Sequence, residues 1–281
     1  MPPVAITFVD PEMRMEYESQ LPTRQERKER LNNILTQCAN YEECGNTRAR
    51  AELKAKYCSQ ECQKSHWRNG HKTQCTPAEL GGVKNLPLRL AERALAAPVL
   101  VEHFHNMAVT VLDLVDKRSD WTRYAVRMPC TTQPGDLTRH LQHMINGHPE
   151  LSDSEPKCLR IAPVTKVLIE DMPEGTRKVA LAMRDKVRRK VGNAHPLMTF
   201  WFTLEEDGDD GMSFTSTLPL PDEAVIWLST NPEKMIMRRS PVTGTSMVPR
   251  TEAIIREGLN TVIRQDTSNT MRLRVFPNKP N

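Results

Sequence analysis

The spacing of hydrophobic positions alternates between the helical and the strand period along most of the chain. Apolar residues recur every three or four positions in several segments, and this pattern predicts helices over residues 88–97, 98–117, 136–146, 174–193 and 251–266. Alternating or continuous apolar runs predict strands over residues 121–128, 158–170, 197–206, 212–218, 223–229 and 271–276. Helices and strands are therefore mixed throughout residues 88–281, which we predict to form one α+β domain.

The first part of the chain has a different pattern. Residues 1–37 are predicted to form an N-terminal arm with a charged helix, whose Leu31, Ile34 and Leu35 share one face. A cysteine-rich module follows at residues 38–75, and residues 76–87 read as a linker because proline and a Gly-Gly pair interrupt them. The predicted fold class is thus α+β, with a small zinc-stabilised module attached to a larger mixed domain.

The number and clustering of the cysteines indicate which kind of site to expect. The chain has 7 cysteines, and most of them lie between residues 38 and 75. The N-terminal residues lack the basic start and apolar run of a secretory signal, and no stretch reaches the about 20 apolar residues of a membrane helix. We therefore expect an intracellular protein, in the nucleus or the cytoplasm. Clustered cysteines in a reducing compartment favour a metal site over disulfides.

The spacing of the donors supports a metal. Cys58 and Cys62 are four residues apart, and so are His71 and Cys75. Residues four apart share a face of a helix, so each pair can present two donors to one ion. Trp67 lies between the pairs and can pack a very small core. A module of this size, below about 40 residues, usually needs a metal or disulfides to fold, which predicts a structural zinc.

Residues 57–75, YCSQECQKSHWRNGHKTQC, resemble the C-terminal half of a MYND-type zinc finger. The resemblance rests on the Tyr-Cys-Ser-x-x-Cys-Gln run, the tryptophan and the His-Lys-x-x-Cys ending. It implies two interleaved zinc sites. One takes a first cysteine pair together with the pair matching Cys58 and Cys62. The other takes an internal cysteine pair together with the residues matching His71 and Cys75.

The sequence departs from that pattern in its upstream half. Cys38 and Cys44 are separated by five residues, where the family usually has two. The positions of the internal pair fall on Ala49, which has no donor atom, and on Glu52, a weak substitute. The resemblance therefore implies a full ligand set for one zinc and an incomplete set for a second.

Three arrangements remain open at this point. One zinc is held by Cys38, Cys44, Cys58 and Cys62; or a rearranged site uses Cys58, Cys62, His71 and Cys75; or the degenerate module binds no metal tightly. The candidate metal ligands are thus Cys38, Cys44, Cys58, Cys62, His71 and Cys75. We expect structural zinc, as one ion with two as the alternative count. A full set of protein ligands leaves no open position for water.

The resemblance also implies a function. MYND fingers are protein-interaction modules that take short proline-containing peptides, and the positions matching their shallow groove are Ser59, Gln63 and Trp67. Gln63 and Trp67 are one helical turn apart, so an amide and an aromatic ring would lie side by side. We therefore predict a zinc-binding module that recruits a partner protein. The alternative role of Trp67 is purely as the core of the module.

The rest of the chain offers weaker signals. Residues 88–281 carry no HExxH, P-loop or GxSxG motif, and nothing resembles the cofactor motif of SET-domain methyltransferases. An enzyme with an unrecognised active site in this domain remains the alternative function. The net charge of +4 is too small to favour a dedicated nucleic-acid binder, and the basic residues of segment 177–190 are read as a solvated helix face. Cys130 and Cys158 are expected to be buried small hydrophobic residues.

Overall fold

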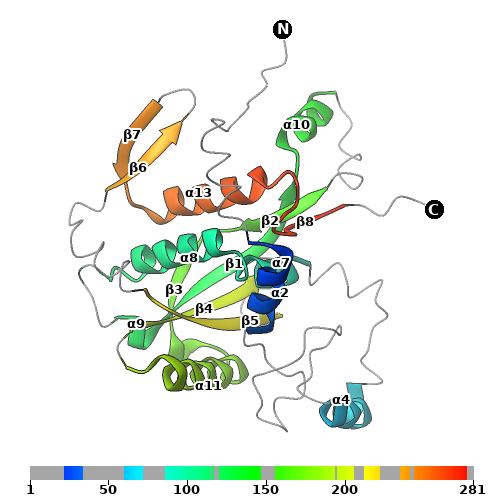
Figure 1. The fold of residues 1–281 in the computed structure, drawn as a ribbon, viewed down its shortest axis with the longest axis vertical. Helices are drawn as coiled ribbons and strands as arrows, with labels where there is room; N and C mark the ends of the chain where they lie inside the picture. The colour runs from blue at the N-terminus through cyan, green and yellow to red at the C-terminus, as the bar shows by residue number, and fades with distance from the viewer. Residues whose placement is uncertain are drawn as a thin grey trace.

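The structure is a computed structural model, and Figure 1 shows its fold. It describes residues 22–33, 60–71, 86–114, 116, 120–146, 156–193, 195–205, 212–221, 235–240 and 244–276. The helices and helical turns are α2 (Arg24–Asn33), α4 (Gln60–His66), η1 (Trp67–His71), α7 (Leu86–Ala94), α8 (Pro98–Val111), α9 (Asp120–Arg123), α10 (Leu137–Ile145), η3 (Ile169–Asp171), α11 (Glu174–Val191) and α13 (Glu252–Gln265). The strands are β1 (Tyr124–Pro134), β2 (Lys157–Ile161), β3 (Thr165–Leu168), β4 (Leu197–Leu204), β5 (Ser213–Pro219), β6 (Met235–Ser240), β7 (Gly244–Pro249) and β8 (Arg274–Val275).

A mixed sheet forms the centre of the molecule. Its strand order is β5-β4-β1-β2-β8, and β3 pairs with β1 beside β2. The pairing of β1 with β4 is parallel, whereas the other pairings in this sheet are antiparallel. Strands β6 and β7 form a separate antiparallel hairpin. The fold is therefore α+β, as the sequence predicts.

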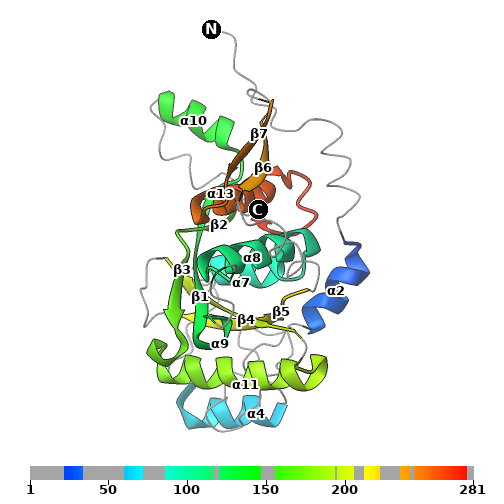
Figure 2. The same cartoon turned by 90° about the vertical axis from the view of Figure 1, so that its left-hand side faces the viewer.

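The two faces of the sheet are covered by different helices. On one face, the side chains of Met128, Phe200 and Phe202 pack with helices α7, α8 and α13 in the main core. On the other face, Ala125 and Trp201 pack with Ala180 of α11 in a smaller core. Figure 2 shows the sheet between α11 and the α7/α8 pair. Both faces of β4 are covered, which explains why all eight of its residues are buried.

Several predicted elements are confirmed. Helices α8 and α11 and strand β4 lie where the hydrophobic pattern predicts them, and Pro163 separates β2 from β3. Proline stands at the first position of α8, where its missing N–H costs no hydrogen bond. Ala180 and Met183 of α11 are buried. Cys130 and Cys158 are fully buried and form no disulfide.

Two strand predictions are partly wrong. Residues 121–123 of the predicted strand 121–128 belong to helix α9, and β1 begins only at Tyr124. Of the predicted strand 271–276, only Arg274 and Val275 form a strand, which pairs with β2. The hairpin of β6 and β7 was not predicted. The predicted strand 223–229 lies outside the described residues.

The predicted N-terminal arm contacts the larger domain. The guanidinium of Arg27 on α2 donates a hydrogen bond to the carbonyl of Thr270, near the C-terminal end of the described chain. Helix α7 begins at Leu86, within the segment expected as a linker, and Leu86 packs against the main core. Among the described helices, none is long and apolar enough to cross a membrane.

Candidate functional site

Helix α4 continues directly into the π-helical turn η1, so residues 60–71 form one helical segment. Glu61 lies in its first turn, and Lys64 and His66 lie in the last turn of α4. The carboxylate of Glu61 stabilises the helix because it opposes the partial positive charge at the N-terminal end. The amide of Asn69 donates to the hydroxyl of Ser65 over 3.4 Å, one turn earlier. None of the side chains of α4 is buried.

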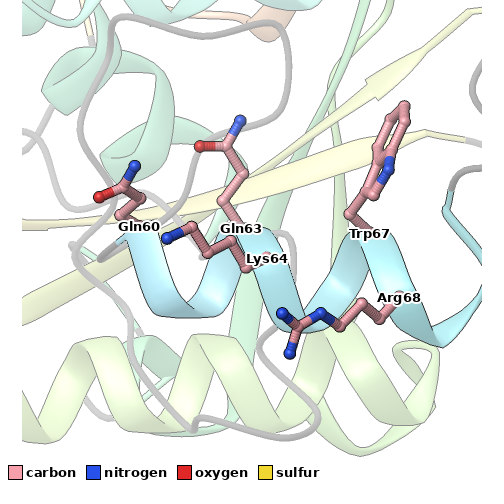
Figure 3. Close-up of a pocket in the computed structure, with 5 residues that line it drawn as sticks. All are labelled: Gln60, Gln63, Lys64, Trp67 and Arg68. Carbon is pink, nitrogen blue, oxygen red and sulfur yellow. The ribbon is translucent and has the colours of Figure 1, made fainter.

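One side of this segment forms a shallow hollow of about 300 Å³, shown in Figure 3. Among the described residues, those that line it are Gln60, Gln63, Lys64, Trp67 and Arg68. In Figure 3, the side chains of Gln60, Gln63 and Trp67 rise from the same edge of the helix. The tryptophan ring is the apolar wall of this hollow, and the two amides supply donors and acceptors beside it.

The exposure of Trp67 distinguishes two of its possible roles. Its side chain is 46% exposed, although tryptophan is among the residues that gain most from burial. Gln63, one turn earlier, is half-buried. A residue that served only as the core of a small module would be expected to be covered. The ring is instead half-exposed and is among the residues that line the hollow.

The predicted metal ligands are only partly visible in the structure. Cys62 lies on α4 and is half-buried, and the backbone of His71 closes η1. Cys38, Cys44, Cys58 and Cys75 lie outside the described residues, as do Ser59 and the side chain of His71. Thiolates and imidazole are the donors that tetrahedral zinc prefers, so the predicted set fits the ion chemically.

The comparison with protein families identifies this module. A family model described as the MYND finger matches residues 36–75. Residues 36–75 are a MYND-type zinc finger. The match begins two residues before Cys38 and ends at Cys75, the last predicted ligand. The chain has no significant match among curated proteins or solved structures.

MYND fingers bind zinc and usually act in protein–protein interaction. The helical segment of residues 60–71 lies in the C-terminal half of this MYND finger and carries Gln63 and Trp67, two of the three positions predicted for its groove. Residues Lys64 and Arg68 also line the hollow, and the sequence analysis did not single them out. The sequence could have indicated Lys64 and Arg68, because they are four residues apart, as Gln63 and Trp67 are.

The larger domain contains no comparable cluster in its described part. No group of three or more histidine, cysteine or acidic residues that could hold a metal occurs among the described residues. His103 and His105 lie on α8 and His140 lies on α10, and both views show these helices apart. His105 is buried, and burial lowers its pKa to about 4. This histidine is therefore neutral at neutral pH and belongs to the core.

Proposed function

We propose that the MYND finger recruits a partner protein by binding a short proline-containing peptide in the hollow beside Gln63 and Trp67. The observation that carries the proposal is the half-exposed indole of Trp67, which stands one helical turn from an amide side chain. A proline ring can lie flat on the indole, and the carboxamide of Gln63 can bond the peptide backbone. Ser59, which lies outside the described residues, is proposed as a third contact.

The proposal includes a structural role for zinc. One zinc ion is held by Cys38, Cys44, Cys58 and Cys62, with two ions as the alternative count. Cys58 and Cys62 then fix the start of α4, so the metal orients the helix that carries Gln63 and Trp67. The binding surface and the zinc are therefore coupled, since loss of the metal would release this helix from the rest of the module.

The same proposal assigns a role to each part of the chain. The MYND finger at residues 38–75 is the recruiting module, residues 1–37 are an N-terminal arm, and residues 76–87 connect the finger to the α+β domain at residues 88–281. A catalytic role for the α+β domain is the alternative hypothesis, and no described cluster favours a particular reaction.

The test uses a displayed library of short peptides that share one fixed proline, selected against the zinc-loaded full-length protein. A selected peptide is then synthesised with a fluorescent label, and its affinity is measured by anisotropy. We expect Trp67→Ala to weaken binding by at least about fivefold, because removal of an aromatic residue that anchors an interface commonly costs more than about 1 kcal/mol. Gln63→Ala should weaken it to a smaller extent.

Phe276→Ala is the matched control. Phe276 is an aromatic residue with a similar exposed fraction of 56%, and it lies at the other end of the described chain. Its replacement should leave the affinity unchanged. Equal affinity of wild type and Trp67→Ala for every selected peptide would contradict the proposal, and so would the failure of the wild-type protein to select any peptide.

A further inference from the structure

Two cations share the hollow with Gln63 and Trp67. Lys64 and Arg68 are four residues apart and both line it. Figure 3 shows their side chains on the same helix as the upright Gln63 and Trp67, with both head groups directed toward its N-terminal end. This direction is normal for long side chains on a helix. Both residues line the hollow, and in Figure 3 their head groups lie lower on the helix than the upright indole.

These two charges are not neutralised within the described part of the chain. Both side chains are exposed, and neither takes part in an ion pair between described residues. Glu61 is the sole acidic residue of the helical segment, and it is not among the residues that line the hollow. The described lining of the hollow thus combines an apolar ring with two positive charges and no acidic residue.

We propose that the peptide bound in this hollow is acidic, with a carboxylate side chain near its proline that pairs with Lys64 and Arg68. This inference rests on the proposed docking function and adds the chemical class of the partner. Charge complementarity is the argument, because an aromatic anchor alone would accept a neutral or basic peptide equally well. Arginine and lysine beside the indole attract acidic peptides and repel basic ones.

The spacing of the cations also fits an extended peptide. Each residue of an α-helix advances about 1.5 Å along the axis, so Lys64 and Arg68, four residues apart, are offset by about 6 Å. Side chains two residues apart in an extended chain point to the same side and are separated by about 6.6 Å. A peptide that runs along the helix can therefore place acidic residues at alternate positions, one for each cation, while its proline contacts the ring of Trp67.

The test compares peptide selection by two forms of the zinc-loaded full-length protein. The first is the wild type, and the second is the double variant Lys64→Gln/Arg68→Gln, which keeps long side chains of good helix propensity and removes both charges. The same fixed-proline library is used for both. We expect aspartate and glutamate to be enriched near the proline in peptides selected by the wild type, and this enrichment to disappear with the double variant.

Affinities give a second readout. An acidic peptide selected by the wild type is compared with the version in which its aspartates are replaced by asparagine. Each exposed ion pair should change the affinity by about two- to fivefold. The difference in affinity between the two peptides should shrink when the salt concentration is raised from about 50 mM to about 500 mM. Dissolved ions then screen the attraction between the peptide carboxylates and the two cations. The control is Arg24→Gln/Lys28→Gln on α2, which removes two cations with the same spacing. It should leave the affinity for the acidic peptide unchanged.

The possible results distinguish the acidic partner from the docking function on which it rests. Peptide binding that requires Trp67, with no acidic enrichment and no effect of Lys64→Gln/Arg68→Gln, would overturn the acidic partner and leave the docking function intact. Binding that is insensitive to Trp67→Ala would overturn the docking function. Binding of a single-stranded oligonucleotide that depends on Lys64 and Arg68, without selection of acidic peptides, would assign these cations to a nucleic acid and overturn the proposal.

Discussion

The side chain of Asn260 binds both backbone groups of Ile161, as a neighbouring strand would. Its carboxamide oxygen accepts a hydrogen bond from the Ile161 N–H over 2.9 Å, and its amide nitrogen donates to the Ile161 carbonyl over 2.9 Å. Asn260 lies on α13 and is only 2% exposed, whereas Ile161 ends β2. Helix α13 is thereby held to the sheet by directional bonds as well as by apolar packing.

Replacing Asn260 should destabilise the larger domain strongly. In Asn260→Leu, the N–H and carbonyl of Ile161 would be buried without partners, and each unpaired group costs about 1–3 kcal/mol. We therefore expect the free energy of unfolding to fall by roughly 2–5 kcal/mol, measured by urea titration. Asn146→Leu, at an exposed position after α10, is the control and should change it by less than about 0.5 kcal/mol. Equal stability of the two variants would show that the hydrogen bonds of the Asn260 side chain contribute little to the stability of the domain.

A second prediction concerns hydroxyl groups beneath α11. Thr199 on β4 and Thr217 on β5 are paired across the sheet, and both side chains are buried. Neither hydroxyl oxygen has a hydrogen-bond partner in the described structure. Because valine has the same shape without the hydroxyl, Thr199→Val should raise the free energy of unfolding by about 1 kcal/mol, measured as a higher urea midpoint.

Thr215→Val is the matched control for this prediction. Thr215 lies on the same face of β5, but its hydroxyl lies 3.5 Å from the sulfur of Met183 and makes a weak hydrogen bond to it. Its replacement should therefore stabilise the domain less than Thr199→Val does. A loss of stability in Thr199→Val would mean that its hydroxyl is hydrogen-bonded in solution.

The sequence predicted those elements whose burial follows a regular period. Helix α11 shows its apolar face at helical spacing, and β4 is apolar at nearly every position because both of its faces are covered. The parallel pairing of β1 with β4 joins segments far apart in the chain, and no local pattern contains that information. The sheet order therefore came only from the structure.

The wrong strand predictions have local physical causes. Trp121 lies in helix α9, and its ring packs against the guanidinium groups of Arg184 and Arg188 from α11, which lie 5.7 and 5.3 Å from its centroid. Before β8, the carboxylate of Asp266 accepts hydrogen bonds from the N–H groups of Thr270 and Met271 and turns the chain. In both cases a side chain from another turn or element overrides the strand propensity of the apolar run.

For the candidate site, the sequence predicted residue types but not their surroundings. The spacing of Gln63 and Trp67 placed them on one helix face, and the structure agrees. Spacing alone does not show that Gln63 and Trp67 line a hollow, or that Lys64 and Arg68 line it with them. Both facts depend on which side chains are exposed. Exposure of Trp67 depends on how the whole module packs around it, and a periodic pattern cannot report that.

A third prediction concerns the response of stability to pH. His105 on α8 is 8% exposed, and burial lowers its pKa from the ordinary 6.5 to about 4, although a hydrogen bond with the backbone of Pro219 opposes this shift. Burial also lowers the pKa of His103. The unfolded chain takes up a proton at higher pH than the folded protein does. The stabilising contribution of neutral His105 is therefore complete above pH 6.5 and is lost as the pH falls from 6.5 toward 4.

The size of this effect can be measured by urea titration at a series of pH values. The shift of His105 corresponds to roughly 3 kcal/mol between the two ends of the window. In His105→Leu, the free energy of unfolding should depend less steeply on pH in this window, whatever its absolute value. An unchanged slope would show that His105 is charged or exposed in the folded protein. His140→Leu, at a partly exposed position on α10, should leave the slope as in the wild type.

A fourth prediction separates the two ligand arrangements of the MYND finger by the metal content of single variants. If zinc is held by Cys38, Cys44, Cys58 and Cys62, Cys38→Ser should abolish zinc binding and Cys75→Ser should retain it. The rearranged site with His71 and Cys75 predicts the opposite result for these two variants. Cys62→Ser should lose zinc in either case, since Cys62 belongs to both sets. The measurement is elemental analysis of protein purified without added zinc.

The wild-type protein should contain one zinc per chain, and Cys158→Ala should contain the same amount. Cys158 is a fully buried thiol on β2, outside the MYND finger, so this variant controls for the removal of a cysteine as such. Two zinc ions in the wild type would mean that Glu52 or another donor completes a second site. A wild-type protein without zinc would contradict the structural role of the metal. In that case Trp67→Ala and the cysteine variants should be compared for peptide binding, because a finger that binds without zinc must orient α4 by packing alone.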